Sequence, residues 1–83
     1  MRKEIKEAIK IHQGEVLPLG TACAHPSDSM TYELIMYDGD FAVLSWNGVT
    51  KRFPANEIFD VNKVKNTAVS IHVESVFENA QFN

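Results

Sequence analysis

The fold is decided by residues 41–53, Phe-Ala-Val-Leu-Ser-Trp-Asn-Gly-Val-Thr-Lys-Arg-Phe. Apolar residues alternate with others on both sides of Asn47-Gly48, and this dipeptide between two such runs is the strongest short-range signal for a β-hairpin. Both central residues of a type I′ turn need a positive φ, which asparagine and glycine tolerate best. We therefore expect strands at 41–46 and 49–53, with these opposite pairs: Trp46 with Val49, Leu44 with Lys51, and Ala42 with Phe53.

A third strand over residues 31–37 extends the hairpin into a meander, because Asp38-Gly39 is a second two-residue turn signal. The pairs expected across this turn are Met36 with Phe41, Ile35 with Ala42, and Leu34 with Val43. One face would carry Ile35, Tyr37, Leu44, Trp46, Val49 and Phe53. The opposite face would carry Tyr32, Leu34, Met36, Phe41 and Val43. Because both faces are rich in apolar side chains, we expect a sheet that is covered twice or closed into a barrel.

The N-terminal segment predicts a helix and then a weak strand. A helix is expected over residues 2–13, because four side chains recur at helical spacing on one face, namely Ile5, Ala8, Ile9 and His12. Residues 15–24 alternate as a strand does, but Pro18 cannot donate a ladder hydrogen bond, so this strand is expected at an edge or interrupted. Residues 25–29 are turn formers and predict a loop.

The C-terminal third has less definite patterns. Residues 54–58 predict one helical turn with proline first, and residues 59–61 a short strand. A polar loop is expected at 62–66 and a strand at 67–73, where valine and isoleucine alternate with polar residues. After Val73 the spacing fits either a strand or a helical turn, and residues 79–83 are expected to be a frayed tail.

These elements predict one α+β domain over residues 1–83, with the helix followed by a β-rich body at 15–77 and a mostly antiparallel five-stranded sheet. The order of elements resembles the small barrels of the Sm and Tudor type, most closely from Ala42 to Gly48 and on through Pro54 and Ile58. The resemblance implies a closed barrel and no functional residue. The Asp and Asn of the Sm motif have no counterpart, and a Tudor-type aromatic cage would have to use Trp46, Phe53 and Tyr37.

Composition narrows the class of protein. Eighty-three residues with a single cysteine allow a small core and no internal disulfide, and domains of this size often gain stability by self-association. We therefore expect a homo-oligomer, with these candidate interface residues on the first helix: Ile5, Ile9 and Ile11. The longest apolar run has four residues, so we expect no membrane segment and a cytoplasmic protein.

The charge distribution argues against a protein built mainly to hold duplex nucleic acid. Residues 1–12 carry four basic and two acidic side chains, whereas residues 13–83 carry four basic and nine acidic ones. Binding to phosphates depends on many lysine and arginine contacts, so a mildly acidic body leaves at most a small local anion site.

Candidate catalytic groups are few. Cys23 and His25 would point to one side of a strand with Asp28 nearby, but a nucleophile and its base need hydrogen-bond reach and an orienting group. A buried cysteine beside a loop histidine is the commoner arrangement. Zinc ligands come in closely spaced pairs that this chain lacks. We therefore expect a protein that is not an enzyme, with no metal and no cofactor.

Trp46 is the main candidate for binding, together with Tyr37, Lys51 and Arg52. Exposed at a hairpin end beside two cations, Trp46 would suit stacking on a base or anchoring a partner, although a core tryptophan paired with Val49 is the commoner case. The leading hypothesis is a small binding protein that acts by occupancy. Such a protein, of the kind that phages and mobile elements use as inhibitors, sequesters a small ligand or blocks a protein partner. The alternatives are a barrel that binds RNA or single-stranded DNA, and a Cys23-dependent enzyme.

Overall fold

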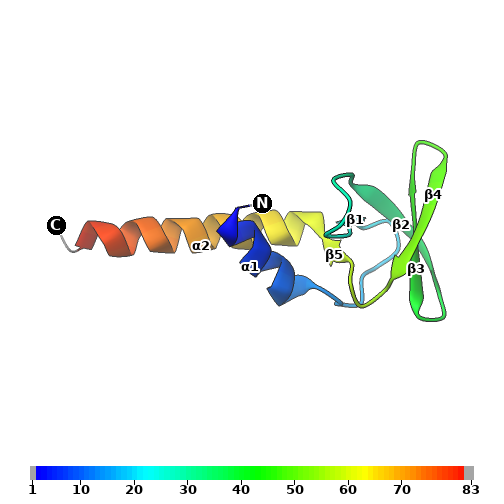
Figure 1. The fold of residues 1–83 in the computed structure, drawn as a ribbon, viewed down its shortest axis with the longest axis horizontal. Coiled ribbons are helices and arrows are strands. Elements are labelled where there is room, and N and C mark those ends of the chain that lie inside the picture. Colours follow the sequence, from blue (N-terminus) through cyan, green and yellow to red (C-terminus); the bar gives the residue numbers. More distant parts are fainter. Residues whose placement is uncertain (1, 82–83) are drawn as a thin grey trace.

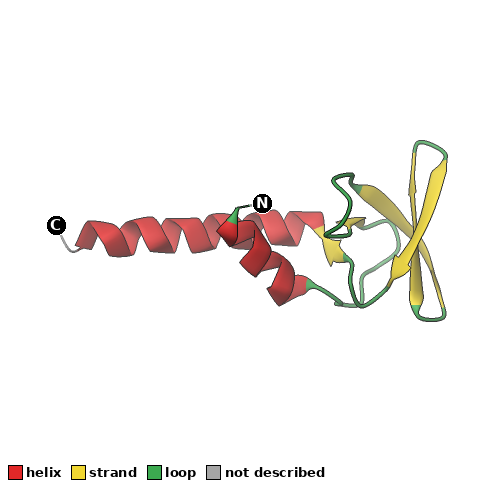
Figure 2. Ribbon diagram, in the orientation of Figure 1, coloured by secondary structure: helices red, strands yellow, loops and turns green. Residues whose placement is uncertain are grey.

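The computed structural model describes residues 2–81, with side chains through residue 74 and at residue 76, and shows an α+β fold (Figures 1 and 2). Its sheet has the order β4-β3-β2-β1-β5, and neighbouring strands are antiparallel. The sheet is open, so the expected barrel is wrong and β4 and β5 are its edges. The elements are α1 (Lys3–His12), β1 (Ala22–Ala24), β2 (Tyr32–Asp38), β3 (Phe41–Trp46), β4 (Val49–Pro54), β5 (Phe59–Asp60) and α2 (Val61–Gln81).

The β3–β4 hairpin forms as predicted. Asn47 and Gly48 have φ values of 50° and 80°, as a type I′ turn requires. The strands pair in the expected register: Trp46 with Val49, Leu44 with Lys51, and Ala42 with Phe53. This hairpin is the frame that places Trp46 at its end.

The β2–β3 register differs from the prediction. The turn falls at Gly39-Asp40, where Gly39 has a φ of 58°, and glycine in the first central position is the pattern of a type II′ turn. The pairs are therefore Asp38 with Phe41, Tyr37 with Ala42, and Met36 with Val43. A β-bulge follows between Leu34 and Met36, and beyond it Leu34 pairs with Leu44. The bulge brings Leu34 to the same face as Tyr37 and Leu44, so the predicted division of these side chains between two faces is wrong.

The outer face of the meander is open to solvent, contrary to the expectation of a sheet covered on both sides. Ile35, Met36 and Phe41 are each about two-fifths to one-half exposed. Arg52 pairs in register with Val43 on this side, and its guanidinium lies 5.1 Å from the centre of the Phe41 ring. A cation with a long aliphatic stem thus covers part of an apolar face without a second layer.

Two separate apolar clusters meet at the short β1–β5 pair. The sheet cluster contains Leu17, Cys23, Tyr32, Leu34, Ala42, Leu44 and Ile58. The helix cluster contains Ala8, Ile9, Ala24, Phe59, Val64 and Ala68. Adjacent residues of a strand point to opposite faces, so Cys23 and Ala24 enter different clusters, as do Ile58 and Phe59. The β1–β5 pair is therefore the wall between the two cores.

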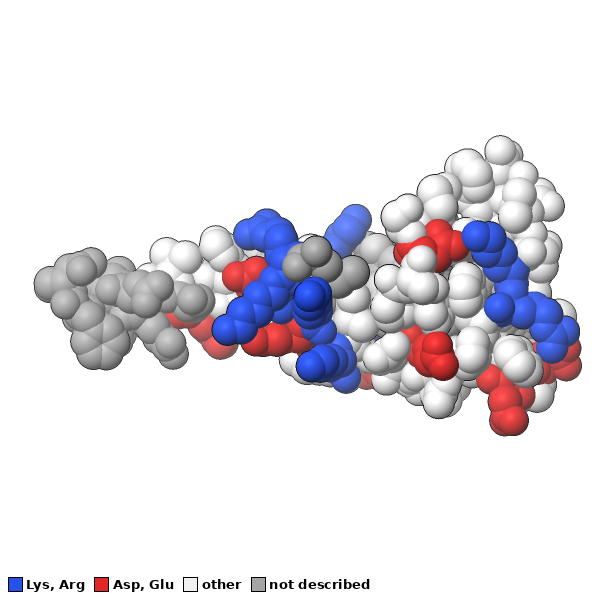
Figure 3. Space-filling model, viewed as in Figure 1, with Lys and Arg blue, Asp and Glu red and all other residues white. Residues whose placement is uncertain are grey.

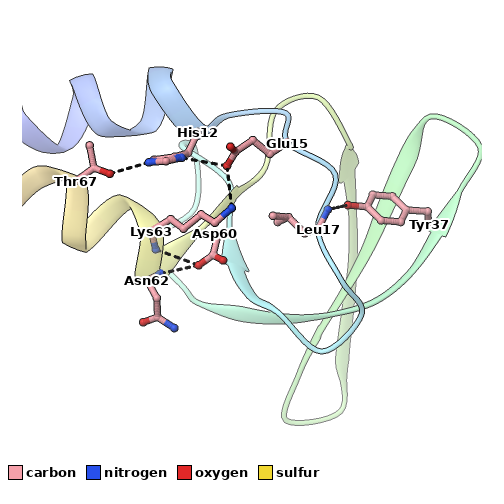
Figure 4. Close-up of polar contacts among 8 residues, drawn as sticks. All are labelled: His12, Glu15, Leu17, Tyr37, Asp60, Asn62, Lys63 and Thr67. Carbon is pink, nitrogen blue, oxygen red and sulfur yellow. Dashed lines mark hydrogen bonds and ion pairs between the residues drawn. The ribbon is translucent and has the colours of Figure 1, made fainter.

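The strand predicted over residues 15–24 is reduced to β1. This strand lies inside the sheet, between β2 and β5, and not at an edge. Ahead of it, Leu17 is buried, and its backbone N–H donates to Tyr37 Oη at 2.9 Å (Figure 4). The helical turn expected at 54–58 is a simple turn closed by a bond from Glu57 N–H to the Pro54 carbonyl at 3.0 Å. The short strand expected after it is present as β5.

Helix α2 occupies residues for which a loop at 62–66 and a strand at 67–73 were expected, so both of these predictions are wrong. The β-rich body expected at 15–77 therefore ends at β5. Asp60 caps the helix: its Oδ1 accepts the N–H groups of Asn62 at 2.9 Å and Lys63 at 3.2 Å (Figure 4). The alternating valine and isoleucine residues favour a strand by propensity, but the cap and the packing of Val64 and Ala68 override it. Of the tail expected at 79–83, residues 82 and 83 lie outside the described residues.

Helix α1 packs beside the N-terminal half of α2 (Figure 1). The His12 ring links their ends, with Nε2 2.7 Å from Thr67 Oγ1 and Nδ1 3.1 Å from a Glu15 carboxylate oxygen (Figure 4). Lys63 Nζ lies 3.7 Å from the same Glu15 oxygen. The rest of α2 extends beyond α1, which gives the molecule dimensions of 52 × 23 × 19 Å.

Replacing Asp60 with alanine removes the acceptor that caps α2. We expect Asp60→Ala to lower the free energy of unfolding by about 1 kcal/mol, the usual effect of losing an N-cap oxygen, in urea denaturation followed by circular dichroism. Asp60→Asn keeps a capping oxygen and should stay close to the wild type. Equal stability of the alanine variant and the wild type would show that the cap contributes nothing.

Candidate functional site

The end of the β3–β4 hairpin carries two large apolar side chains outside the core. Trp46 and Val49 lie opposite each other in register, and they are 48% and 49% exposed. The predicted cross-strand pair is therefore present, but it does not belong to either apolar cluster. Two half-exposed apolar side chains on adjacent strands form a compact apolar surface, which we call the hairpin end.

A shallow depression of about 330 Å³ adjoins Trp46. Its other walls come from the 20–22 segment, the start of β2 and the end of β3, including Gly20, Thr31, Glu33 and Ser45. Gly20 N–H donates to the Leu34 carbonyl at 2.8 Å, so this wall is held against β2. The depression gives Trp46 a neighbouring hollow whose lining mixes polar and apolar groups.

Lys51, two residues from Val49 on β4, is held by the 25–31 loop. Its Nζ lies 2.8 Å from Asp28 Oδ2, and the Tyr32 hydroxyl donates to the same oxygen at 2.8 Å. The other Asp28 oxygen accepts the Met30 backbone N–H at 2.9 Å. This cluster, Asp28 with Lys51, Tyr32 and Met30 N–H, ties the loop to β4 and steadies the strand behind the hairpin end.

The same contacts shift two pKa values in opposite directions. Hydrogen bonds from Lys51, from the Met30 N–H and from Tyr32 lower the pKa of Asp28 to about 2. The hydrogen bond to Asp28 raises the pKa of Lys51. Both groups are thus charged at neutral pH, and the Lys51 charge is already matched by a carboxylate.

The four predicted binding residues do not form one surface. Trp46 and Lys51 lie on one face of the hairpin, whereas Arg52 lies on the other, 2.9 Å from Asp38 Oδ2. Tyr37 packs against the sheet cluster, and its hydroxyl accepts the Leu17 N–H. Trp46 therefore lies at the hairpin end with Val49. Tyr37 packs on the sheet cluster, and Arg52 forms an ion pair with Asp38.

Cys23 and His25 have separate environments. Cys23 is fully buried in the sheet cluster, and burial, with Asp60 nearby, raises the pKa of its thiol to about 11. The His25 ring stacks on Phe53 with centroids 4.6 Å apart. A thiol in this state is a poor nucleophile, so the geometry offers no support for a Cys23-dependent reaction.

His25 does form a chain of contacts with Ser27 and Glu57. Its Nδ1 accepts the Ser27 backbone N–H at 3.0 Å and lies 2.7 Å from Ser27 Oγ, while Nε2 lies 2.7 Å from a Glu57 carboxylate oxygen. A backbone N–H and a hydroxyl compete for the same nitrogen, which is the geometry of a local turn contact. Neither of the two concavities described for this chain is lined by Ser27 or His25.

The remaining histidines each lie beside a carboxylate: His12 beside Glu15, and His72 with its Nδ1 3.9 Å from Glu4. Within the described part of the chain, no group of three or more His, Cys, Asp or Glu side chains is placed to hold a metal ion.

The larger of two concave surfaces in the described part of the chain lies between α1, α2 and the 24–31 segment, and the sequence did not predict it. This helix groove has a volume of about 550 Å³, and its apolar walls include Ile5, Ile9, Phe59, Val61, Val64 and Ala68. Of the predicted interface residues, Ile5 and Ile9 thus line the groove, whereas Ile11 does not and is 60% exposed. The helical spacing of Val61, Val64 and Ala68 could have indicated this wall of the groove. The strand-like alternation that begins at residue 67 favoured a strand there instead.

No protein-family model, curated protein or solved structure matches the chain. No helix in the described residues combines the length and apolar character needed to cross a membrane.

The Asp28 cluster makes stability depend on pH. The folded-state pKa of Asp28 is about 2, against an ordinary value of 3.8, so its carboxylate stabilises the fold above about pH 4 and loses that contribution as the pH falls toward about 2. Urea midpoints of the wild type should fall across this window more than those of Asp28→Asn. The exposed-carboxylate variant Glu7→Gln should follow the wild type. Parallel curves for Asp28→Asn and wild type would contradict this assignment.

The Cys23 thiol should react slowly while the protein is folded. At neutral pH we expect iodoacetamide to modify Cys23 at least tenfold more slowly in buffer than in denaturing urea, because burial both raises the thiol pKa and blocks access. Mass spectrometry of timed samples measures the two rates. Equal rates would mean that Cys23 is accessible in the folded chain and would revive the enzymatic alternative.

Proposed function

We propose that this chain is a small non-enzymatic binding protein that acts by occupancy, and that the hairpin end docks on a protein partner and blocks it. The observation that carries the proposal is the exposure of Trp46. A tryptophan is the residue type that most often dominates a binding interface, and here it lies with Val49 on a strand pair whose register is fixed by an Asn47-Gly48 turn.

The support beneath the hairpin end favours binding without rearrangement. Lys51 and Asp28 join β4 to the 25–31 loop at 2.8 Å, and the β3 strand behind Trp46 has the fully buried Leu44 at its centre. A rigid aromatic anchor loses little conformational freedom when it is covered, which is why tryptophan is effective in such positions.

Charge pairing favours a protein partner over RNA or single-stranded DNA. Single-stranded nucleic acids are held by stacking together with cations that follow the backbone. Here Lys51 is paired with Asp28 and Arg52 with Asp38, and Glu33 lines the depression beside Trp46. A mixed surface around one large aromatic residue is more typical of a protein interface.

A display library tests this proposal without a known partner. Random peptides are selected on the immobilised full-length chain, synthesised, and titrated while the emission of Trp46, the single tryptophan of the sequence, is followed. We expect selected peptides to change that emission and to bind Trp46→Ala at least tenfold more weakly. Val16→Ala is the matched control, because Val16 is 89% exposed and is not part of the hairpin end.

Two results would contradict the proposal. Selected peptides that bind Trp46→Ala as well as the wild type would place the interface elsewhere. Salt-dependent binding of a labelled single-stranded oligonucleotide that is lost in Trp46→Ala would assign the same surface to nucleic acid.

A further inference from the structure

Helix α2 is twice as long as the helix that covers it. It spans 21 residues, whereas α1 spans 10. The N-terminal half of α2 lies beside α1 and forms one wall of the helix groove, and its C-terminal half extends past the rest of the described chain (Figure 1). One helix therefore supplies both a concave apolar surface and an uncovered projection.

The projecting half carries a valine stripe, formed by Val69, Val73 and Val76. These side chains are 62%, 57% and 54% exposed. At 100° per residue they fall within an arc of about 60° on the helix surface, and Val69 also lines the helix groove. The stripe is thus a direct continuation of the groove, and the combined apolar surface is longer than a small ligand would cover.

The molecule exposes more surface than a compact monomer of its size. Its accessible area is 5635 Å², whereas a monomer of 9.3 kDa is expected to expose roughly 5000 Å². Its radius of gyration is 14.9 Å, against roughly 12 Å for a compact chain of this length. The excess area, roughly 600 Å², approaches the ~800 Å² that each partner contributes to a standard stable interface.

Charges differ between the two halves of α2. The groove itself is mixed, because Arg2 and Lys65 line it together with Glu4 and Asp28, and Figure 3 shows basic and acidic side chains together in the middle of the molecule. The N-terminal half of α2 contributes Lys63 and Lys65 and no acidic side chain. By contrast, residues 66–83 contain two glutamates and no lysine or arginine. An antiparallel pair of α2 helices would bring opposite charges together, whereas a parallel pair would bring like charges together.

We propose that a second copy of this chain covers the valine stripe and the end of the helix groove at Val69. Two chains pair antiparallel through α2 about a two-fold axis near His72, so that their valine stripes lie against each other and Val76 of each copy reaches the groove of the other at Val69. Val69 of one copy then faces Val76 of its partner, and each contact occurs twice, as in any isologous interface. This inference uses the helical part of the molecule, which does not include Trp46 or Val49, and it does not depend on the proposed function.

The oligomeric state tests the pairing. Sedimentation of the wild-type chain at micromolar concentration should give twice the monomer mass of 9.3 kDa. Val73→Glu introduces a carboxylate at an exposed site that the folded monomer tolerates, and we expect it to weaken the dimer at least tenfold with an unchanged circular dichroism spectrum. Val16→Glu, at an exposed position outside the groove, should leave the dimer intact. A monomeric wild type, or a dimer indifferent to Val73→Glu, would overturn the proposal.

Cross-linking tests the orientation. A mixture of Val69→Cys and Val76→Cys chains should form a mixed disulfide on mild oxidation, because these positions face each other across the two-fold axis. Each variant alone should cross-link poorly, because identical positions are separated along the helix axes in an antiparallel pair. Efficient cross-linking of Val76→Cys with itself would indicate a parallel pair and would overturn the proposed arrangement. The wild-type Cys23 is buried and does not interfere.

Discussion

The pairing of β1 with β5 is the interaction on which the rest of the structure depends. The two strands have three and two residues, yet they separate the apolar clusters and join them. Cys23 and Ile58 enter the sheet cluster, while their neighbours Ala24 and Phe59 enter the helix cluster. Because Asp60 ends this pair and caps α2, the same few residues also fix where the long helix begins.

Local chemistry made part of the fold predictable. The Asn47-Gly48 turn sets both its own conformation and the register of β3 with β4, so these pairs followed from sequence. The bulge in β2 did not, because it depends on Leu34 reaching the buried face beside Leu44, which is a tertiary requirement. Helix α2 was missed for the same reason: its valines and isoleucine favour a strand by propensity, and contact with α1 decides the outcome.

The candidate site was predictable in location and less so in composition. Trp46 was expected at the end of the hairpin, and the structure places it there. Its exposure depends on where the core ends, at Leu44, and no local pattern encodes that limit. Tyr37 and Arg52 suit binding by residue type, but the folded chain uses the first to hold Leu17 and the second to pair with Asp38. Residue type therefore suggested four side chains for binding, and of these only Trp46 lies at the hairpin end.

The position of the β3–β4 hairpin at the far end of the molecule from the projecting half of α2 (Figure 1) has a consequence for binding strength. Antiparallel pairing of two such chains would send their tryptophans outward in opposite directions, on a stiff helical spacer. A target with two copies of the recognised epitope at that separation would then be held bivalently, and the second contact would benefit from a high effective concentration. A target with a single epitope would gain nothing. The length of α2 would thus set the avidity of the dimer, and with it the preference for targets with two suitably spaced epitopes over targets with one.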